Sequence, residues 1–329
     1  MLCPPSFRWN ESIPVKLFTF YLTKTNCKTP GTAALSVALL FLFLFASSLW
    51  ADNKDIKTAN RIISTSPSIT ETLFALGLKD RVIAVTDFCK YPQEACSLPS
   101  IGGMINPSME TMVSLTPDLL IHASGNQRMA NNAKSLGIQT LQVDMDNLAE
   151  IFASIKKLGA VLNCQESAEK LLLRLNEGIA FYQERLKSLP RKEVLLLLGD
   201  SSDPSRDLYA AGPGTFLNEL LNLSGGNNII RDSPARYPKL SKEYIIEKSP
   251  EVIIEAGPKS DLPQKEIDLR IHDWGRFPTI TAVKNGQIHF IGADYILIPG
   301  PRLLKIIEQF SKAIHPEIFK SSMSLQGTP

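Results

Sequence analysis

The sequence carries almost no net charge of either sign. Its 329 residues include 35 Lys and Arg against 33 Asp and Glu, a formal net charge of +2. A protein that binds nucleic acid needs a basic face, so this balance argues against that class. The hydrophobic content of 44% is enough for a large core. The length could hold two domains of ordinary size.

Nucleotide-binding and hydrolase motifs are missing. Glycines cluster at three places where a phosphate loop could form, namely 102–103, 212–214 and 225–226. None has the GxGxxG spacing after a strand or ends in GK[ST], so we interpret them as turns. After residue 51 the chain has no GxSxG, the nucleophile elbow of many serine hydrolases. We therefore expect that the protein is not an enzyme.

Histidine is scarce as well. The four histidines are scattered, at His122, His272, His289 and His315, and none lies at HExxH spacing. Metal centres built on histidine need several ligands that converge, so no metal site is predicted. His122 stands at the end of an apolar segment, where its side chain could still reach a ligand.

The first fifty residues differ from the rest. Residues 1–32 carry four basic side chains and the single acid Glu11, and an apolar run follows over 34–51. A basic segment, an apolar segment and a small-residue exit are typical of a cleavable signal peptide, here 1–51. The apolar stretch is shorter than the roughly 20 residues that span a bilayer. We expect export to the periplasm. No cysteine follows the run before Cys89, which argues against a lipid anchor.

Three cysteines remain after residue 51. In an oxidising compartment Cys89 and Cys96 could form a disulfide across a short loop, and the alternative is two free thiols. Cys164 would be left over, as a small buried or capping residue.

Beyond residue 51, short apolar segments alternate with helical patterns. Strands are expected at 61–64, 82–85, 119–122, 140–143, 194–198, 252–254 and 288–291. Helices are expected from Ser68 or Thr70 to Leu76, and over 109–115, 129–136, 216–223 and 302–314. This alternation is typical of parallel α/β sheets.

One stretch between residues 148 and 189 has helical spacing only. It breaks near Asn163, and the segment 166–189 reads as one long helix that Pro190 ends. At 1.5 Å per residue this helix would be roughly 36 Å long. The sequence therefore predicts two α/β lobes joined by helices, with lobes at 52–150 and 190–329 and a helical linker at 151–189.

The two predicted lobes contain a weak internal repeat. SMETMVSLTPDLLIHASG begins at Ser108, and SKEYIIEKSPEVIIEAG begins at Ser241. Glu110 then matches Glu243, and each segment reads as a helix, a proline turn and a buried strand. We interpret this as a duplication. Ligands of α/β sheets bind at the carboxyl ends of the strands, so two such lobes could face each other across a cleft.

Several segments resemble the periplasmic binding proteins of cobalamin, heme and ferric-siderophore ABC importers. They are RIISTSPSITETLFALG, VIAVTDFCKYP, IGGMINPSMETMVSLTPDLLI, LSGGNNII, YPKLSKEYIIEKSPEVII and IPGPRLL. The resemblance covers residues 61–315 and is nearest to the cobalamin branch. It implies an α/β fold of two Rossmann-like lobes joined by a single long rigid helix.

The resemblance also implies a function. The protein would bind cobalamin between the lobes, without a cofactor of its own, and deliver it to a membrane permease with cytosolic ATPase subunits. We expect a monomer. An iron complex, either a ferric siderophore or heme, is the alternative ligand; heme would need an axial Tyr91, Tyr209 or His122. A surface or signalling receptor that binds without transport is the second alternative.

Site residues follow from the same resemblance. Glu110 and Glu243 match the acids that dock onto arginines of the permease. The expected ligand-binding residues are aromatic or lie in loops after strands, because flat side chains cover a broad ligand at low entropy cost. They are Phe88, Tyr91, Met104, Tyr237, Asp294 and Tyr295. The tryptophan-rich cleft of the family is not evident, and Trp274 is expected in a loop with a structural role.

Overall fold

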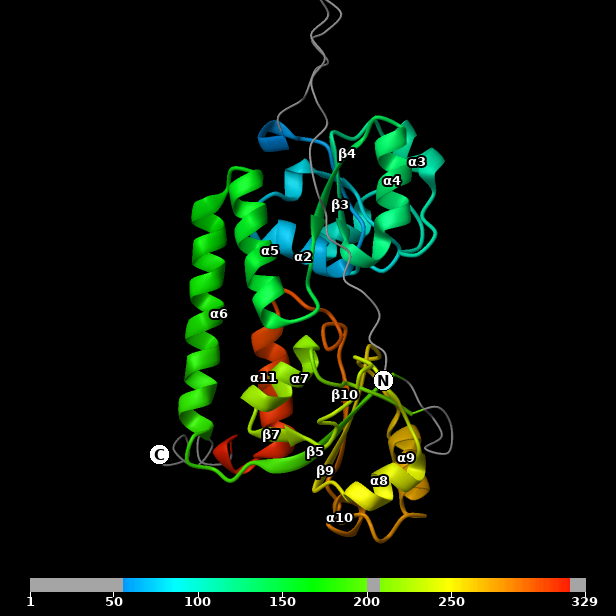
Figure 1. Ribbon diagram of the computed structural model, residues 1–329, viewed down its shortest axis with the longest axis vertical. Coiled ribbons are helices and arrows are strands. Elements are labelled where there is room, and N and C mark those ends of the chain that lie inside the picture. Colours follow the sequence, from blue (N-terminus) through cyan, green and yellow to red (C-terminus); the bar gives the residue numbers. More distant parts are fainter. Residues whose placement is uncertain (1–55, 200–207, 320–329) are drawn as a thin grey trace, which may run out of the picture. The chain divides into compact units, whose positions relative to one another are not determined.

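The computed structural model describes residues 56–199 and 208–319, and the predicted signal peptide lies outside these ranges. The described part contains two β-sheets with helices around them, and a pair of helices lies between the two sheets in the sequence (Figure 1). We call β1–β4 with α2–α4 the first lobe, and β5–β10 with α7–α11 the second lobe. No helix in the described ranges is long and apolar enough to cross a membrane.

The first sheet has four parallel strands in the order β2-β1-β3-β4. The strands are β1 (Ile62–Ser64), β2 (Val82–Ala84), β3 (Leu119–Ala123) and β4 (Gln139–Val143). Leu119, Leu120 and Ile121 are fully buried in succession. Such continuous apolar runs are expected for parallel strands covered on both faces. The four strands predicted for this lobe are confirmed.

Three helices accompany this sheet, together with short 3-10 segments. The helices are α2 (Pro67–Ala75), α3 (Met109–Ser114) and α4 (Gln127–Ser135). The 3-10 segments are η2 (Ile56–Thr58), η3 (Lys79–Arg81), η4 (Gln93–Ser97) and η5 (Ser124–Asn126). The hydroxyl of Ser66 caps α2 by accepting from the Ile69 amide, and Pro67 occupies the first turn. This capping pattern fixes where the helix begins.

Two consecutive helices connect the lobes. Helix α5 (Leu148–Val161) and helix α6 (Gln165–Leu186) are separated by a turn in which Asn163 has a φ of 59°. At Gly159 an added Cβ would lie 2.5 Å from the Ala168 Cβ, so the glycine permits close packing of the two helices. The predicted long helix is confirmed, with 22 residues and an end at Leu186. Its length is therefore about 33 Å.

The second sheet runs in the order β10-β9-β5-β6-β8, and β7 also pairs with β5. Its strands are β5 (Lys192–Leu198), β6 (Leu208–Ala210), β7 (Gly226–Asn228), β8 (Lys239–Leu240), β9 (Val252–Gly257) and β10 (Ile288–Gly292). Strands β5, β7, β9 and β10 are mutually parallel, whereas β6 and β8 are antiparallel to their neighbours. The predicted strands β5, β9 and β10 are confirmed, and the other three escaped prediction because they are short and contain no β-branched residue.

Helices cover both faces of the second sheet. They are α7 (Phe216–Leu223), α8 (Lys242–Lys248), α9 (Gln264–Trp274), α10 (Thr281–Lys284) and α11 (Leu303–Ile314). In Figure 1, α7 and α11 lie on the side of α6, and α8 and α9 lie on the other side. Successive side chains of β5 point to opposite faces of the sheet. Val194 and Leu196 pack into one core cluster, and Leu195 and Leu197 pack into another.

The expectation that Trp274 lies in a loop is wrong, although its structural role is supported. Trp274 is the last residue of α9 and is only 1% exposed. Its indole Nε1 donates to Glu255 at 2.7 Å, and Arg270 donates to the same carboxylate at 3.1 Å. The partners Trp274 and Arg270 satisfy a glutamate buried inside strand β9.

The internal repeat has matching helix ends in the two lobes. The hydroxyl of Ser108 caps α3 and that of Ser241 caps α8. A residue with positive φ then precedes the proline in each, Thr116 with 42° and Ser249 with 40°. Such a backbone is costly for residues other than glycine, so its recurrence at matching positions is informative.

The acids that follow the prolines also make matching contacts. The Asp118 amide donates to the Arg61 carbonyl at 2.9 Å, and its carboxylate accepts from the Arg61 amide at 3.2 Å. The Glu251 amide and carboxylate make the same two bonds to Glu193, each at 2.8 Å. Caps, strained turns and reciprocal hydrogen bonds therefore recur together, as a duplication predicts.

Candidate functional site

The residues predicted to bind the ligand lie in loops outside the strands. Phe88 and Tyr91 follow β2, and Asp294 and Tyr295 follow β10 after one intervening residue. Tyr237 precedes the edge strand β8. Because both sheets carry parallel strands, loops that follow their carboxyl ends are the expected place for a ligand.

Arg302 joins the two lobes through a buried ion pair. Its side chain, at the start of α11, is 7% exposed, and Glu71 in the middle of α2 is 2% exposed. The pairing is bidentate, with Nε donating to Glu71 Oε2 at 2.8 Å and Nη2 donating to Oε1 at 2.5 Å. The remaining nitrogen, Nη1, donates to Asp294 at 2.6 Å. Two parallel bonds fix the guanidinium in position and orientation.

Three of the predicted ligand residues gather around this guanidinium. Besides the bond to Asp294, Arg302 lies 4.0 Å from the ring centre of Tyr91 and 5.2 Å from that of Tyr295. Tyr91 is 42% exposed, so its ring is held by the arginine on one side and open to solvent on another. Cation–π contact with a buried arginine is worth more than with an exposed one.

Burial sets the protonation preferences of this cluster. Desolvation raises the pKa of Glu71 above the ordinary carboxyl value, and the bonds from Arg302 offset this only in part. For Arg302, burial opposes the charge, but hydrogen bonds to Glu71 and Asp294 outweigh it and hold the pKa above its usual range. The arginine therefore stays charged.

Tyr237 lies at a second junction between the lobes. Asp146, which follows β4, forms an ion pair with Arg236, and the Asp146 carbonyl accepts from the Phe216 amide at 2.6 Å. Burial raises the pKa of the Tyr237 hydroxyl, and the nearby Asp146 carboxylate raises it further. Tyr237 thus stays a neutral hydrogen-bond donor. Its side chain is 46% exposed.

Phe88 and Met104 are not drawn into either junction. Phe88 is 59% exposed, and Met104 is half-buried in the loop before α3. Neither has a ring or hydrogen-bond contact with the other predicted ligand residues in the described part of the chain. Their exposure leaves them available to a ligand.

The cysteines near this loop are not bonded in the structure, so the suggested disulfide is corrected to two free thiols. Cys89 is buried and turns inward, where its sulfur accepts from the Thr70 hydroxyl at 3.1 Å. Cys96 is exposed and donates to the Lys90 carbonyl at 3.4 Å. The two side chains thus have separate partners and different environments. Cys164 stands at the N-cap position of α6 without a capping side-chain bond.

The predicted docking glutamates occupy equivalent and exposed positions. Glu110 and Glu243 are the second residues of α3 and α8, directly after the capping serines. Hydrogen bonds from its own amide and from Ser241 lower the pKa of Glu243. Within the described ranges, neither glutamate forms an ion pair. Both charges are therefore free to meet a partner.

Candidate heme ligands are placed differently from one another. His122 is buried inside β3, where Nδ1 lies 2.9 Å from the Ala123 carbonyl, and burial lowers its pKa. Tyr209 in β6 is 47% exposed. Among the described residues no group of three His, Cys, Asp or Glu side chains is arranged to hold a metal ion.

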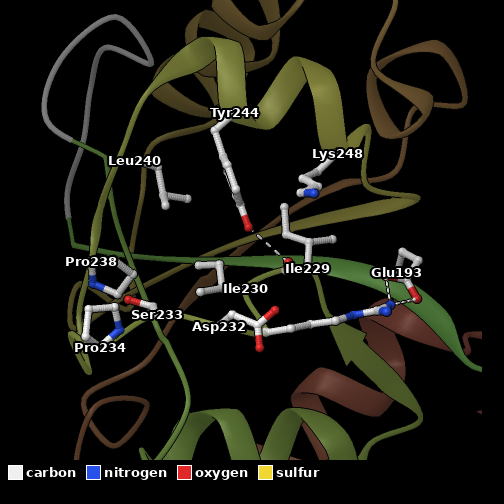
Figure 2. Close-up of a pocket in the computed structure, with 11 residues that line it drawn as sticks. Glu193, Ile229, Ile230, Asp232, Ser233, Pro234, Pro238, Leu240, Tyr244 and Lys248 are labelled. Atoms are coloured by element: carbon white, nitrogen blue, oxygen red, sulfur yellow. Dashed lines mark hydrogen bonds and ion pairs between the residues drawn. The ribbon is translucent and has the colours of Figure 1, made fainter.

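A pocket of about 540 Å³ opens within the second lobe (Figure 2). Figure 2 shows Tyr244 extending from α8 so that its hydroxyl donates to the Ile229 carbonyl, at 3.1 Å. Glu193, which also lines the pocket, forms an ion pair with Arg231 at 2.8 Å. The described lining of this pocket includes none of the predicted ligand residues.

Sequence reasoning did not single out the charged residues that tie the lobes together. Glu71 and Arg302 both lie in quoted motifs, SPSITETLFALG and IPGPRLL, but no role was assigned to them. A signal was present, since Glu71 is the only charge in a helix that is otherwise apolar or hydroxylated. Asp146 and Arg236 gave no such signal.

Comparisons with known proteins agree with this architecture. A family model described as periplasmic binding protein matches residues 62–295. An uncharacterised ABC-transporter substrate-binding lipoprotein of Bacillus subtilis is 30% identical over 278 residues, which cover 82% of this chain and 85% of the relative. A vitamin B12-binding protein of Photorhabdus laumondii is 27% identical, with 88% of this chain and 97% of the relative covered.

Solved structures give the same result. The periplasmic vitamin B12-binding protein of Vibrio cholerae superposes with a TM-score of 0.67 at 26% identity, covering 78% of this chain and 96% of that one. A periplasmic heme-binding protein from Pseudomonas aeruginosa has the same fold, with a TM-score of 0.68, 23% identity and coverage of 79% and 94%. The two sheets, the long connecting helix and the matched motifs make this chain a member of the periplasmic binding protein family.

Proposed function

We propose that this protein is the substrate-binding component of an ABC importer and that its ligand is cobalamin. The family match over residues 62–295 carries the first part. Membership of this family also supports export, with residues 1–51 as the cleaved signal. The matched relatives are binding proteins of transporters and not enzymes, which supports a role in capture without catalysis.

The choice of cobalamin rests on similarity and on side-chain chemistry. The Photorhabdus vitamin B12-binding protein is similar over 88% of the chain. Phe88, Tyr91 and Tyr237 are large, aromatic and substantially exposed. A corrin ring is broad and partly apolar, so exposed aromatic side chains with a few polar anchors suit it. Asp294, Tyr295 and Met104 complete the proposed set.

Capture and delivery would use different surfaces. The ligand would bind between lobes that extend over 52–150 and 190–329, with the linker 151–189 between them. Glu110 and Glu243 would dock onto arginines of the permease, whose ATPase subunits hydrolyse ATP. Neither glutamate is paired within the described part of the chain, which supports this use.

Calorimetric titration of residues 52–329 with cyanocobalamin tests the ligand. We expect one-to-one binding that weakens at least about tenfold in Tyr237→Ala. Heme and a ferric hydroxamate, titrated in parallel, serve as controls. Heat from an iron complex and none from cobalamin would show that the ligand is an iron complex, and the proposed transport role would stand. No response to any of the three would contradict the proposed ligand class.

A further inference from the structure

A second pocket of about 540 Å³ lies where both lobes meet the connecting helix. Its walls come from α2, from the loop at Tyr91 and Pro92, from α6 and from the start of α11. It is distinct from the pocket of Figure 2, with which it shares no residue. Phe74, Pro301 and Leu304 supply apolar surface.

Basic side chains dominate the polar part of this pocket. Four line it, Lys79, Arg174, Arg302 and Lys305, against two acids, Glu71 and Glu94. Glu71 is already committed to Arg302 by the buried bidentate pair. Apart from the Glu71–Arg302 pair, the pocket is therefore lined by three basic side chains and one exposed acid, Glu94.

Those three basic side chains lack acidic partners. In the described ranges, no ion pair within 4.0 Å involves Lys79, Arg174 or Lys305. They come from three separate elements, namely η3, α6 and α11. Three cations that converge on one cavity repel one another, at a cost that an anion would relieve.

The start of α11 adds to the positive potential. This helix has 12 residues, and its first turn contains no acidic residue and no capping side-chain hydrogen bond. Lys305 lies within that first turn, where the partial positive charge of the helix end disfavours a cation. The Leu303 and Lys305 amides already donate to the Gly300 and Arg302 carbonyls, so this helix end contributes through its positive potential and not through a row of free amides.

We infer that this pocket binds the phosphate group of a small molecule or a lipid headgroup, held by Lys79, Arg174 and Lys305 at the start of α11. Because these residues come from the first lobe, the connecting helix and the second lobe, the bound phosphate would hold the three together. This inference does not depend on the identity of the transported ligand.

Calorimetry with inorganic pyrophosphate tests the site in residues 52–329. The triple variant Lys79→Gln, Arg174→Gln, Lys305→Gln removes the three side chains and leaves the Glu71–Arg302 pair intact. We expect the dissociation constant to rise at least about tenfold. A second triple variant, Lys134→Gln, Lys156→Gln, Lys284→Gln, removes the same charge from exposed positions outside the pocket and should bind as the parent does.

Co-sedimentation with phosphatidylglycerol vesicles, with phosphatidylcholine vesicles as the control, identifies the source of the phosphate. Pyrophosphate binding that only the pocket variant loses supports a soluble phosphate compound. Vesicle binding that only the pocket variant loses supports a lipid headgroup. If neither probe binds, or if both triple variants weaken binding equally, the pocket is not a phosphate site.

Discussion

The guanidinium of Arg302 is buried and bonds to two carboxylates, Glu71 from the first lobe and Asp294 from the second. A buried ion pair adds little net stability, but removal of one partner leaves an uncompensated buried charge. The main role of Arg302 is therefore to position its neighbours, including the ring of Tyr91, whose centre lies 4.0 Å from the guanidinium.

Replacing the arginine tests this view. Arg302→Met should lower the free energy of unfolding by roughly 3–5 kcal/mol, because Glu71 then stays buried without its cation. Urea unfolding measures the change. The matched control is Arg231→Met, which removes an exposed pair with Glu193 and should cost less than about 1 kcal/mol. Equal losses in the two variants would contradict a special role for the buried pair.

His122 should make stability depend on pH. Burial lowers its pKa below the ordinary value of 6.5, so the folded protein holds this imidazole neutral while the unfolded chain binds a proton more readily. Its contribution to stability is thus present above pH 6.5 and is lost as pH falls towards the lowered folded pKa.

Thermal unfolding between pH 5 and 7 should show a melting temperature that falls as the pH falls, and His122→Gln should show a smaller fall. His289, whose pKa burial also lowers, would account for the remainder. An unchanged slope in the variant would rule His122 out.

At the scale of single elements, prediction from sequence succeeded where a segment is long or bounded by proline and glycine. Helix α6 was predicted because no proline interrupts 22 residues of helical spacing. Strands β6, β7 and β8 were missed because they contain no β-branched residue, whereas β1 and β2, with three residues each, contain two apiece. Helix α9 was missed because its spacing is mostly polar and its only fully buried aromatic residue, Trp274, comes at the end.

The cluster around Arg302 shows the same limit of local patterns. Tyr91, Asp294 and Tyr295 could be placed in loops from local motifs, and the structure brings them together. The residue that gathers them could not be recognised, because Arg302 and Glu71 are 231 positions apart in the sequence. A pairing over such a distance leaves no local pattern. The same holds for Asp146 and Arg236, 90 positions apart.

The packing of α5 against α6 allows a test at Gly159. An added Cβ would lie 2.5 Å from the Ala168 Cβ, so Gly159→Ala should destabilise the protein by about 1–3 kcal/mol through overpacking. Adding Ala168→Gly in the same chain removes the clash and should recover part of the loss, measured by urea unfolding. The matched control is Gly125→Ala, where an added Cβ meets nothing within 4 Å. Two losses that simply add would show that the contact is not what limits this position.

For the whole molecule, the duplicated glutamates predict a separation between capture and delivery. The double change Glu110→Ala with Glu243→Ala should leave ligand affinity unchanged, because both side chains lie at exposed helix starts and neither belongs to the proposed ligand residues. Cellular uptake should be lost, since docking would lose both charge-assisted contacts. Glu169→Ala with Glu177→Ala removes two other exposed acids and is the control. Normal uptake in the first variant would exclude these residues as the docking points.

Helix α6 also limits how the lobes can move. Bending a continuous helix sharply requires a proline, a bulge or an inserted group, and the 22 residues of α6 contain no proline. The buried pair of Glu71 with Arg302 adds a second tie between the lobes. Ligand binding should therefore change the radius of gyration very little. Small-angle scattering with and without cyanocobalamin measures this, and Arg302→Met should allow a larger change than the parent because the variant lacks the buried tie to Glu71. A large compaction of the unmodified protein would show instead that the helix bends or that its ends act as hinges.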